Sequence, residues 1–325
     1  MGGVSGVSEA DLQLIRHLAD GAFCSGSQLG ELLGVSRAAV WKRMQRLTEL
    51  GLAVESVKGR GYRLAHPLRL LDPGSLSAAL AGRADLHYHC ATGSTNADAL
   101  ALEGGGKPQL VVAEYQYAGR GRRGRQWQSP FAANLYLSLR YSLARGFSAL
   151  GGLSLAVGVA AAQVLMRHVP GLPVGLKWPN DLQVNGDKLG GILIELAGEM
   201  DGQVDVVVGL GINGEMTPDQ ARDIDQRWTD LASHAGRPLD RSALCADLAV
   251  TMLEALEQFS ADGFAPFMAG FERLDVCNGL QVEVLAGDQR ICGVASGVSD
   301  DGALLLRTEQ GLSQLHGGEV SLRVQ

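Results

Sequence analysis

The sequence is poor in cysteine: five cysteines are scattered over 325 residues, and no two of them form a Cys-x-x-C pair. An odd, widely spaced set favours neither a disulfide framework nor a zinc site, and it suits the reducing cytoplasm. The N-terminus lacks the basic segment and apolar run of a secretory signal, so we do not expect secretion. The longest apolar run, residues 155–162, is far shorter than the roughly 20 residues that cross a bilayer. We therefore expect a cytoplasmic protein without a membrane segment.

Excess positive charge is also lacking. The formal net charge of −7 excludes a protein that coats nucleic acid with its whole surface. The charge is unevenly divided, because residues 1–66 carry a net +2 and the remainder −9. With 46% apolar residues and room for two or three domains, the chain is globular, and the charge asymmetry marks a separate N-terminal module.

The N-terminal module, residues 1–66, has the pattern of a winged helix-turn-helix. Helical spacing of apolar residues begins at Leu12, a second short helix is predicted over residues 25–33, and Ser36 can cap a third that runs to about residue 50. Residues 53–64 then read as a β-hairpin with a basic tip at residues 58–61. Three helices and a wing follow from this order of signals.

The third helix divides into a core side and a polar side. Val40, Met44 and Leu47 form the apolar side, which leaves the opposite side for DNA bases and phosphates. The DNA-binding residues that we predict are Arg37, Trp41, Lys42 and Gln45 on this helix, with Lys58 and Arg60 on the wing. A solvated helix face, a dimerisation module or an interdomain support remains the alternative, and tryptophan is an unusual residue on a DNA-reading face.

Two further regions follow a proline-rich boundary at residues 66–74. Residues 67–275 mix strand-like runs at 110–115, 135–141, 192–196 and 204–210 with helices at 152–168 and 241–259. Residues 276–325 carry short β runs at 281–285, 291–294, 303–308 and 320–324. The predicted fold class is therefore α+β multidomain, with domains at 1–66, 67–275 and 276–325, the last a small SH3-like barrel.

A cationic, glycine-rich loop at residues 119–127 follows the first of these strands. Its glycines permit close backbone approach to a ligand, its arginines suit phosphate or carboxylate, and Trp127 offers a face for stacking. The G-x-G-x-x-G pattern occurs here at 119–124 and again at 209–214. Neither match is followed by the helix that a dinucleotide fold needs, which argues against a nicotinamide site.

Three more polar clusters complete an ordered series: Thr92-Gly93-Ser94-Thr95-Asn96, Lys177-Trp178-Pro179-Asn180-Asp181 and Lys188-Leu189-Gly190-Gly191-Ile192. With the cationic loop and Gly209-Leu210-Gly211-Ile212-Asn213, this series resembles the biotin protein ligase family. The resemblance is close over residues 92–213, and the layout covers essentially the whole chain. With its N-terminal module, the chain is similar to the bifunctional form, which is both biotin–[acetyl-CoA-carboxylase] ligase and biotin operon repressor.

The resemblance implies a two-step reaction that uses ATP and Mg²⁺. Biotin is activated to biotinyl-5′-AMP and then joined to a lysine of the biotin carboxyl carrier protein of acetyl-CoA carboxylase. It also implies that the adenylate acts as corepressor, that adenylate binding promotes a homodimer, and that the dimer binds operator DNA.

The resemblance also implies roles for particular residues. Biotin would be contacted by Ser94, Thr95, Asn96, Gln116 and the backbone of residues 120–122, which includes Gly121. The catalytic residues would be Lys188, Arg122 and Asp181, with Lys188 at the activated carboxylate and Asp181 meeting the acceptor lysine. Arg120, Arg122 and Arg125 would lie near the phosphates, Trp127 against adenine, and Asn180 and Asn213 near the nucleotide or metal. We predict no protein cluster that binds metal. For Lys188 a surface role, and for Asp181 a turn role, stay open from the residues alone.

Other functions remain open at this point. Lipoate protein ligase shares the activation chemistry, a monofunctional biotin ligase would use the N-terminal module structurally, and a ligand-responsive DNA-binding regulator would lack ligase activity. The C-terminal domain could serve either acceptor docking or closure of the ATP site.

Overall fold

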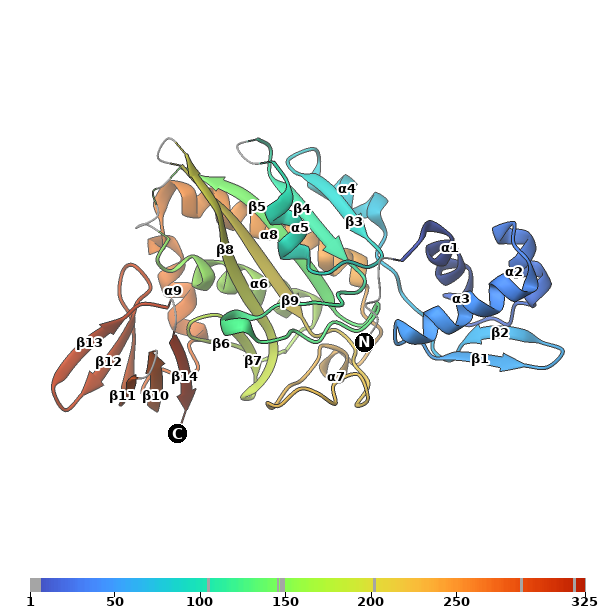
Figure 1. Ribbon diagram of the computed structural model, residues 1–325. Helices are drawn as coiled ribbons and strands as arrows, with labels where there is room; N and C mark the ends of the chain where they lie inside the picture. Colours follow the sequence, from blue (N-terminus) through green and yellow to red (C-terminus); the bar gives the residue numbers. More distant parts are fainter. Residues whose placement is uncertain are drawn as a thin grey trace.

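The structure is a computed structural model that describes residues 7–103, 106–144, 146, 150–200, 203–286, 289–317 and 320–324. Its elements form three groups (Figure 1). The N-terminal helices and the C-terminal strands lie at opposite ends of a large central sheet.

The N-terminal group contains the three helices and the wing that the sequence predicts. Serine hydroxyls cap all three helices, because Ser8, Ser25 and Ser36 each accept a hydrogen bond from a backbone N–H in the first turn. Their apolar sides form a buried cluster that includes Leu14, Leu29, Val40, Met44 and Leu47. The elements are α1 (Glu9–Leu18), α2 (Gly26–Leu33), α3 (Arg37–Glu49), β1 (Val54–Val57) and β2 (Gly61–Leu64).

A buried carboxylate ties α1 to α3. Asp11 is fully buried and accepts hydrogen bonds from the Ser8 hydroxyl at 2.6 Å and from the Arg43 guanidinium at 2.6 Å. Arg46 lies 3.5 Å from the same carboxylate. Burial alone would raise the pKa of Asp11, but the hydrogen bonds from Ser8 and Arg43 lower this pKa below its ordinary value overall. Two arginines of the basic third helix therefore hold the domain together.

The central sheet has seven strands in the order β3-β4-β5-β9-β8-β7-β6. Only β3 and β4 run parallel, and every other neighbouring pair is antiparallel. The strands are β3 (Asp85–His89), β4 (Gln109–Ala113), β5 (Leu135–Leu143), β6 (Val174–Lys177), β7 (Asp181–Val184), β8 (Asp187–Met200) and β9 (Gln203–Ile212). The helices are α4 (Pro73–Leu80), α5 (Thr95–Ala101), α6 (Leu153–His168), α7 (Ala232–Ala235), α8 (Arg241–Asp262) and α9 (Ala265–Leu274), with a 3₁₀ turn η1 (Arg122–Gly124).

Alternate side chains of the sheet enter different cores. On β4, Leu110 and Val112 belong to the main core with α6 and α8, whereas Val111 packs with Ala99 of α5 in a small cluster on the other face. The start of α5, with Thr95 and Asn96, is thereby held over one face of the sheet.

A buried ion pair contacts the linker at residues 65–72, between β2 and α4, and holds it against the central sheet. Glu114, which follows β4, lies 2.9 Å from the Arg241 guanidinium at the start of α8. Its other oxygen accepts from the Leu71 backbone N–H and from the Tyr88 hydroxyl. Arg241 also donates to the carbonyls of Arg69 and Asn134. The linker is therefore held against Glu114, which lies two residues before Gln116 in the chain.

The C-terminal strands form a five-stranded antiparallel sheet in the order β13-β12-β11-β10-β14. Val284 and Leu306 of this sheet belong to the same buried cluster as the central core. The strands are β10 (Gln281–Ala286), β11 (Gln289–Val298), β12 (Leu304–Thr308), β13 (Gly311–Leu315) and β14 (Val320–Val324). Sequence patterns predicted four of them and missed β13, whose residues are partly or fully exposed.

None of the helices within the described ranges is both long enough and apolar enough to span a membrane.

Candidate functional site

The predicted site residues meet around a cavity of about 390 Å³ on the face of the central sheet that α5 covers. The cavity is bounded by the start of α5, the loop at residues 119–127, the β6–β7 turn, and strands β8 and β9. Leu322 of β14 also reaches it. The predicted residues that line it are Ser94, Thr95, Asn96, Gln116, Arg120, Gly121, Arg122, Arg125, Trp127, Asp181 and Lys188.

The cationic loop is a tight hairpin. Gly121 N–H donates to the Arg125 carbonyl at 2.7 Å, and Trp127 N–H donates to the Gly119 carbonyl at 2.9 Å. At Gly119 a Cβ would meet the Ser129 hydroxyl and the Trp127 carbonyl at 2.6 Å, so only glycine fits. The hairpin turns Trp127 inward and leaves Arg125 exposed.

Glycines on β8 and β9 make room for the ligand-facing side chains. Gly211 pairs with Gly191 across the two strands, and the Trp127 indole lies against Gly211, where a Cβ would be 2.7 Å from the ring. At Gly209 a Cβ would be 2.0 Å from Asn96 Oδ1. The second G-x-G-x-x-G match is therefore explained by side-chain packing on a strand, without a dinucleotide.

Lys188 is aimed into the cavity by an irregularity in β8. The β7–β8 register shifts between Leu182 and Gln183, so that Leu189 is an extra residue on β8. Lys188 Nζ lies 2.8 Å from Asp181 Oδ1 and 5.6 Å from the centre of the Trp127 ring. Asp181 is thus an ion-pair partner of Lys188, a contact that the sequence did not predict. An ammonium between a carboxylate and an aromatic face can stabilise negative charge on a bound phosphate.

Arg122 links three parts of the chain. Its guanidinium donates to Asn180 Oδ1 at 2.9 Å in the β6–β7 turn and to the carbonyl of Gly317 after β13. The C-terminal sheet therefore contributes to the wall of the cavity. Trp178, fully buried behind the turn, donates to the Gly302 carbonyl at 3.1 Å and makes a second contact with the same sheet.

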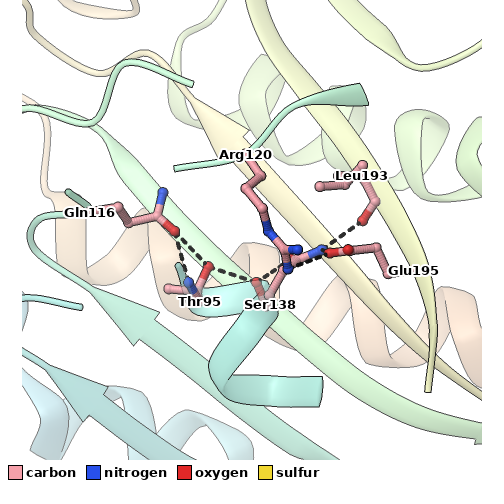
Figure 2. Close-up of polar contacts among 7 residues, drawn as sticks. Thr95, Gln116, Arg120, Ser138, Leu193 and Glu195 are labelled. Carbon is pink, nitrogen blue, oxygen red and sulfur yellow. Dashed lines mark hydrogen bonds and ion pairs between the residues drawn. The ribbon is translucent and has the colours of Figure 1, made fainter. Parts of the chain in front are cut away.

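A chain of polar contacts connects residues that line the cavity to Ser138 and Glu195 behind them (Figure 2). Gln116 Oε1 accepts from the Thr95 backbone N–H at 2.8 Å. The Ser138 hydroxyl lies 2.7 Å from the Thr95 hydroxyl and 2.6 Å from Asn96 Oδ1. Asn96 Nδ2 donates to Glu195 at 2.8 Å, and Arg120 pairs with the same carboxylate oxygen at 3.1 Å.

A second cavity of about 380 Å³ adjoins the first, because Arg125, Trp127 and Lys188 line both. Trp228 lies at its edge, and Asn213 lines only this cavity. The Asn213 amide donates to the carbonyls of Lys188 and Thr229, which holds the backbone of Lys188 in place. The buried indole N–H of Trp127 has no hydrogen-bond partner among the described residues.

Three family models match the chain in the order of the three structural groups. They are the HTH domain at residues 11–63, the biotin/lipoate A/B protein ligase family at 90–213 and the biotin protein ligase C-terminal domain at 279–323. The bifunctional ligase/repressor BirA of Escherichia coli is 42% identical over 96% of this chain and 97% of its own length. The chain belongs to the biotin protein ligase family.

Other relatives agree with this assignment. The biotin–[acetyl-CoA-carboxylase] ligase of Mycobacterium tuberculosis is 35% identical over 66% of this chain and 80% of its own length. The structure of the Aquifex aeolicus biotin protein ligase in complex with biotin and ATP matches with a TM-score of 0.64 at 29% identity, covering 74% of this chain and 99% of that one. The predicted fold class and ligase activity are confirmed: the chain is a biotin protein ligase with an N-terminal helix-turn-helix domain.

In this biotin protein ligase, all six predicted DNA-binding residues are exposed on the N-terminal domain. Arg37, Trp41, Lys42 and Gln45 are exposed along α3, and Lys58 and Arg60 are exposed at the wing. The Arg60 guanidinium lies 4.0 Å above the ring of Phe23, which restrains it. Of the basic residues outside this set, Arg43, Arg46 and Arg63 pair with Asp11 or Glu55.

Residues at or beside the cavities that escaped the sequence analysis include Ser138, Glu195, Asp225, Trp228 and Gly317. Ser138 and Glu195 sit in strands whose apolar neighbours dominate the pattern, and Gly317 belongs to another domain. Trp228 could have been noticed, since the chain has only four tryptophans. Among the described residues, no group of three or more His, Cys, Asp and Glu side chains is arranged to hold a metal ion.

Proposed function

We propose that this ligase activates biotin with ATP and transfers it to a lysine of the biotin carboxyl carrier protein of acetyl-CoA carboxylase. The observation that carries the proposal is the position of Lys188, which lies between Asp181 and Trp127 where the two cavities meet. Biotin would lie at the Thr95 end of the first cavity. The nucleotide would extend past Lys188 and Trp127 toward the second.

In the first step a carboxylate oxygen of biotin forms a bond to the α-phosphorus of ATP, and the bond to pyrophosphate breaks. Negative charge builds on the α-phosphate, where Lys188 and Arg122 stabilise it and Arg125 faces the leaving group. Arg120 and the backbone at Gly121 would orient the biotin carboxylate, and Ser94, Asn96 and Gln116 its ring.

In the second step the neutral amine of the acceptor lysine attacks the acyl carbon of biotinyl-5′-AMP. An amide forms, the bond to the phosphate oxygen breaks, AMP leaves and the amine loses one proton. Asp181 lines the cavity beside Lys188, and we assign it the orientation of the incoming lysine.

Mg²⁺ would enter with the nucleotide. Asp181 and Asp225 are the carboxylates among the residues that line the first cavity, and Asn180 and Asn213 lie nearby. So small a set of oxygen ligands fits an ion held mainly by phosphates, as is usual for Mg²⁺. The ion would neutralise phosphate charge.

The test is release of pyrophosphate by the full-length protein with ATP, Mg²⁺ and either biotin or lipoate. We expect release that requires biotin, is not supported by lipoate, and is followed by transfer of labelled biotin to carrier protein. Release with lipoate alone would reassign the substrate, and the absence of release with either acid would refute the ligase assignment for this site.

We further propose that biotinyl-5′-AMP promotes a homodimer that binds operator DNA as a repressor. The exposed set on α3 and the wing supports this, and so does the linker contact of Glu114 beside the biotin site. Selection of genomic DNA fragments at fixed salt should enrich a palindromic site only with biotin and Mg-ATP. If no DNA site is enriched and the ligands leave the sedimentation of the protein unchanged, the repressor proposal fails and the protein is a monofunctional ligase.

Domain boundaries at 1–66, 67–275 and 276–325 and a cytoplasmic location belong to the same proposal. The family models fall within these boundaries, and Cys24, Cys90, Cys245 and Cys277 form no disulfide.

A further inference from the structure

Glu195 has no part in the proposed chemistry, yet it contacts two residues of the biotin end of the cavity. It lies on β8 with its side chain one-quarter exposed. One carboxylate oxygen receives both the Asn96 amide at 2.8 Å and the Arg120 guanidinium at 3.1 Å (Figure 2).

These contacts fix the orientation of the Asn96 amide. A carboxylate paired with a guanidinium has no proton to donate, and the Leu193 carbonyl, 3.3 Å from Asn96 Nδ2, is also only an acceptor. The NH₂ group of Asn96 must therefore face Glu195 and Leu193. Its oxygen then lies 2.6 Å from the Ser138 hydroxyl, in the space left by Gly209.

The direction of the next two hydrogen bonds follows from counting protons. Ser138 has one hydroxyl proton and must donate it to Asn96 Oδ1, so at the 2.7 Å contact with Thr95 it can only accept. Thr95 donates to Ser138 in preference to Gln116 Oε1, which is farther away at 3.2 Å and already accepts from the Thr95 backbone. Every hydrogen bond from Thr95 to Glu195 thus points toward the carboxylate.

Thr95 lines the cavity, and with its proton committed to Ser138 its hydroxyl oxygen remains there as an acceptor. A ligand that hydrogen-bonds to the Thr95 hydroxyl oxygen must present an N–H or O–H donor. The ureido ring of biotin has N–H groups, whereas the dithiolane ring of lipoate has none.

We propose that Glu195 is a positioning residue for substrate selection, which acts through Asn96 and Ser138 to make Thr95 an acceptor for a ureido N–H. This inference rests on the proposed biotin site. On this inference, the site prefers biotin to an acid without N–H groups, such as lipoate, because the hydrogen bonds from Thr95 to Glu195 all point toward the carboxylate.

Two substitutions separate this role from a simple ion pair. Glu195→Gln loses the charge but can place its amide oxygen where both donors now meet, so the direction is retained. Glu195→Met loses the acceptor as well. We expect biotin to bind Glu195→Gln within about threefold of wild type and Glu195→Met about tenfold or more weakly, because a misdirected buried polar group loses its partner.

The measurement is the dissociation constant for biotin and desthiobiotin by calorimetry, with inhibition constants for lipoate and the KM for ATP. Desthiobiotin keeps the ureido group and should lose as much affinity as biotin in Glu195→Met, while lipoate and ATP should change by less than about twofold, since neither depends on the Thr95 acceptor. Glu254→Gln and Glu254→Met alter a surface pair with Arg83 and serve as matched controls. Ser138→Ala interrupts the same chain with Glu195 intact and should weaken biotin to a similar degree.

Equal losses in Glu195→Gln and Glu195→Met would show an ion-pair role and overturn the inference, as would an equal loss for lipoate. If the wild-type protein does not bind biotin, the proposed function fails first and the inference with it.

Discussion

Replacement of Arg241 by methionine should destabilise the central domain far more than the loss of a surface ion pair. The substitution leaves the fully buried Glu114 carboxylate without its guanidinium partner, which lies 2.9 Å away and is itself only 7% exposed. Removing one member of a buried pair costs about 3–5 kcal/mol, against a total domain stability of about 5–15 kcal/mol. Arg83→Met, which breaks exposed pairs with Glu254 and Glu257, should cost about 0–1 kcal/mol.

The assay is equilibrium unfolding in urea, followed by tryptophan fluorescence, to which the buried Trp178 of the same core contributes. The double variant Arg241→Met/Glu114→Gln should recover part of the loss, because it removes the unpaired charge together with its partner. The reasoning is refuted if the free energy of unfolding of Arg241→Met lies within about 1 kcal/mol of the wild-type value. It is also refuted if the double variant is less stable than Arg241→Met by as much as Glu114→Gln alone destabilises the wild type.

Three further predictions concern the ligase site and the pH response. Lys188→Met should slow pyrophosphate release by about 10²- to 10³-fold in single-turnover assays with biotin and ATP bound, and an unchanged rate would remove Lys188 from catalysis. Gly211→Ala should raise the KM for ATP about tenfold, because its Cβ displaces the Trp127 indole, whereas Gly106→Ala, with no neighbour within 4 Å, should not; equal effects would contradict the packing argument. The pKa of Asp11 is lowered in the folded state, so the stabilisation it provides is present above its unfolded pKa of about 3.8 and is lost as pH falls through the folded pKa. Thermal unfolding of the N-terminal domain between pH 2 and 7 should show this loss in the wild type and not in Asp11→Asn.

The sequence predicts those parts of the molecule that local chemistry specifies. Ser36 and the apolar spacing place α2 and α3 within a residue or two of their observed ends, whereas α1 begins at Glu9, three residues before the predicted spacing starts at Leu12. The ordered motifs bring the predicted ligase-site residues other than Asn213 to one cavity, because the motifs lie at the start of α5, in the loop after β4, and in the turns and strand starts around β7 and β8.

What the sequence did not predict depends on an irregularity in strand pairing and on contacts between distant segments. The pair of Lys188 with Asp181 requires the β8 bulge, and the contact of Arg122 with Gly317 crosses 195 positions of the chain. Likewise Glu195 lies 99 positions from Asn96. The strands β6 and β7 have four residues each, too few to show a clear alternation.

The glycines on β8 and β9 have a wider consequence for the cationic loop. Where Gly209 and Gly211 interrupt the side-chain layer of the sheet, Asn96 and Trp127 fill the gap from outside, so the loop supplies part of a surface that strands ordinarily make for themselves. Movement of the loop away from the sheet would uncover bare backbone, and the space opened would have the depth of the missing side chains. One wall of the substrate site is thus completed by the loop at residues 119–127, which covers strand backbone that carries no side chains of its own.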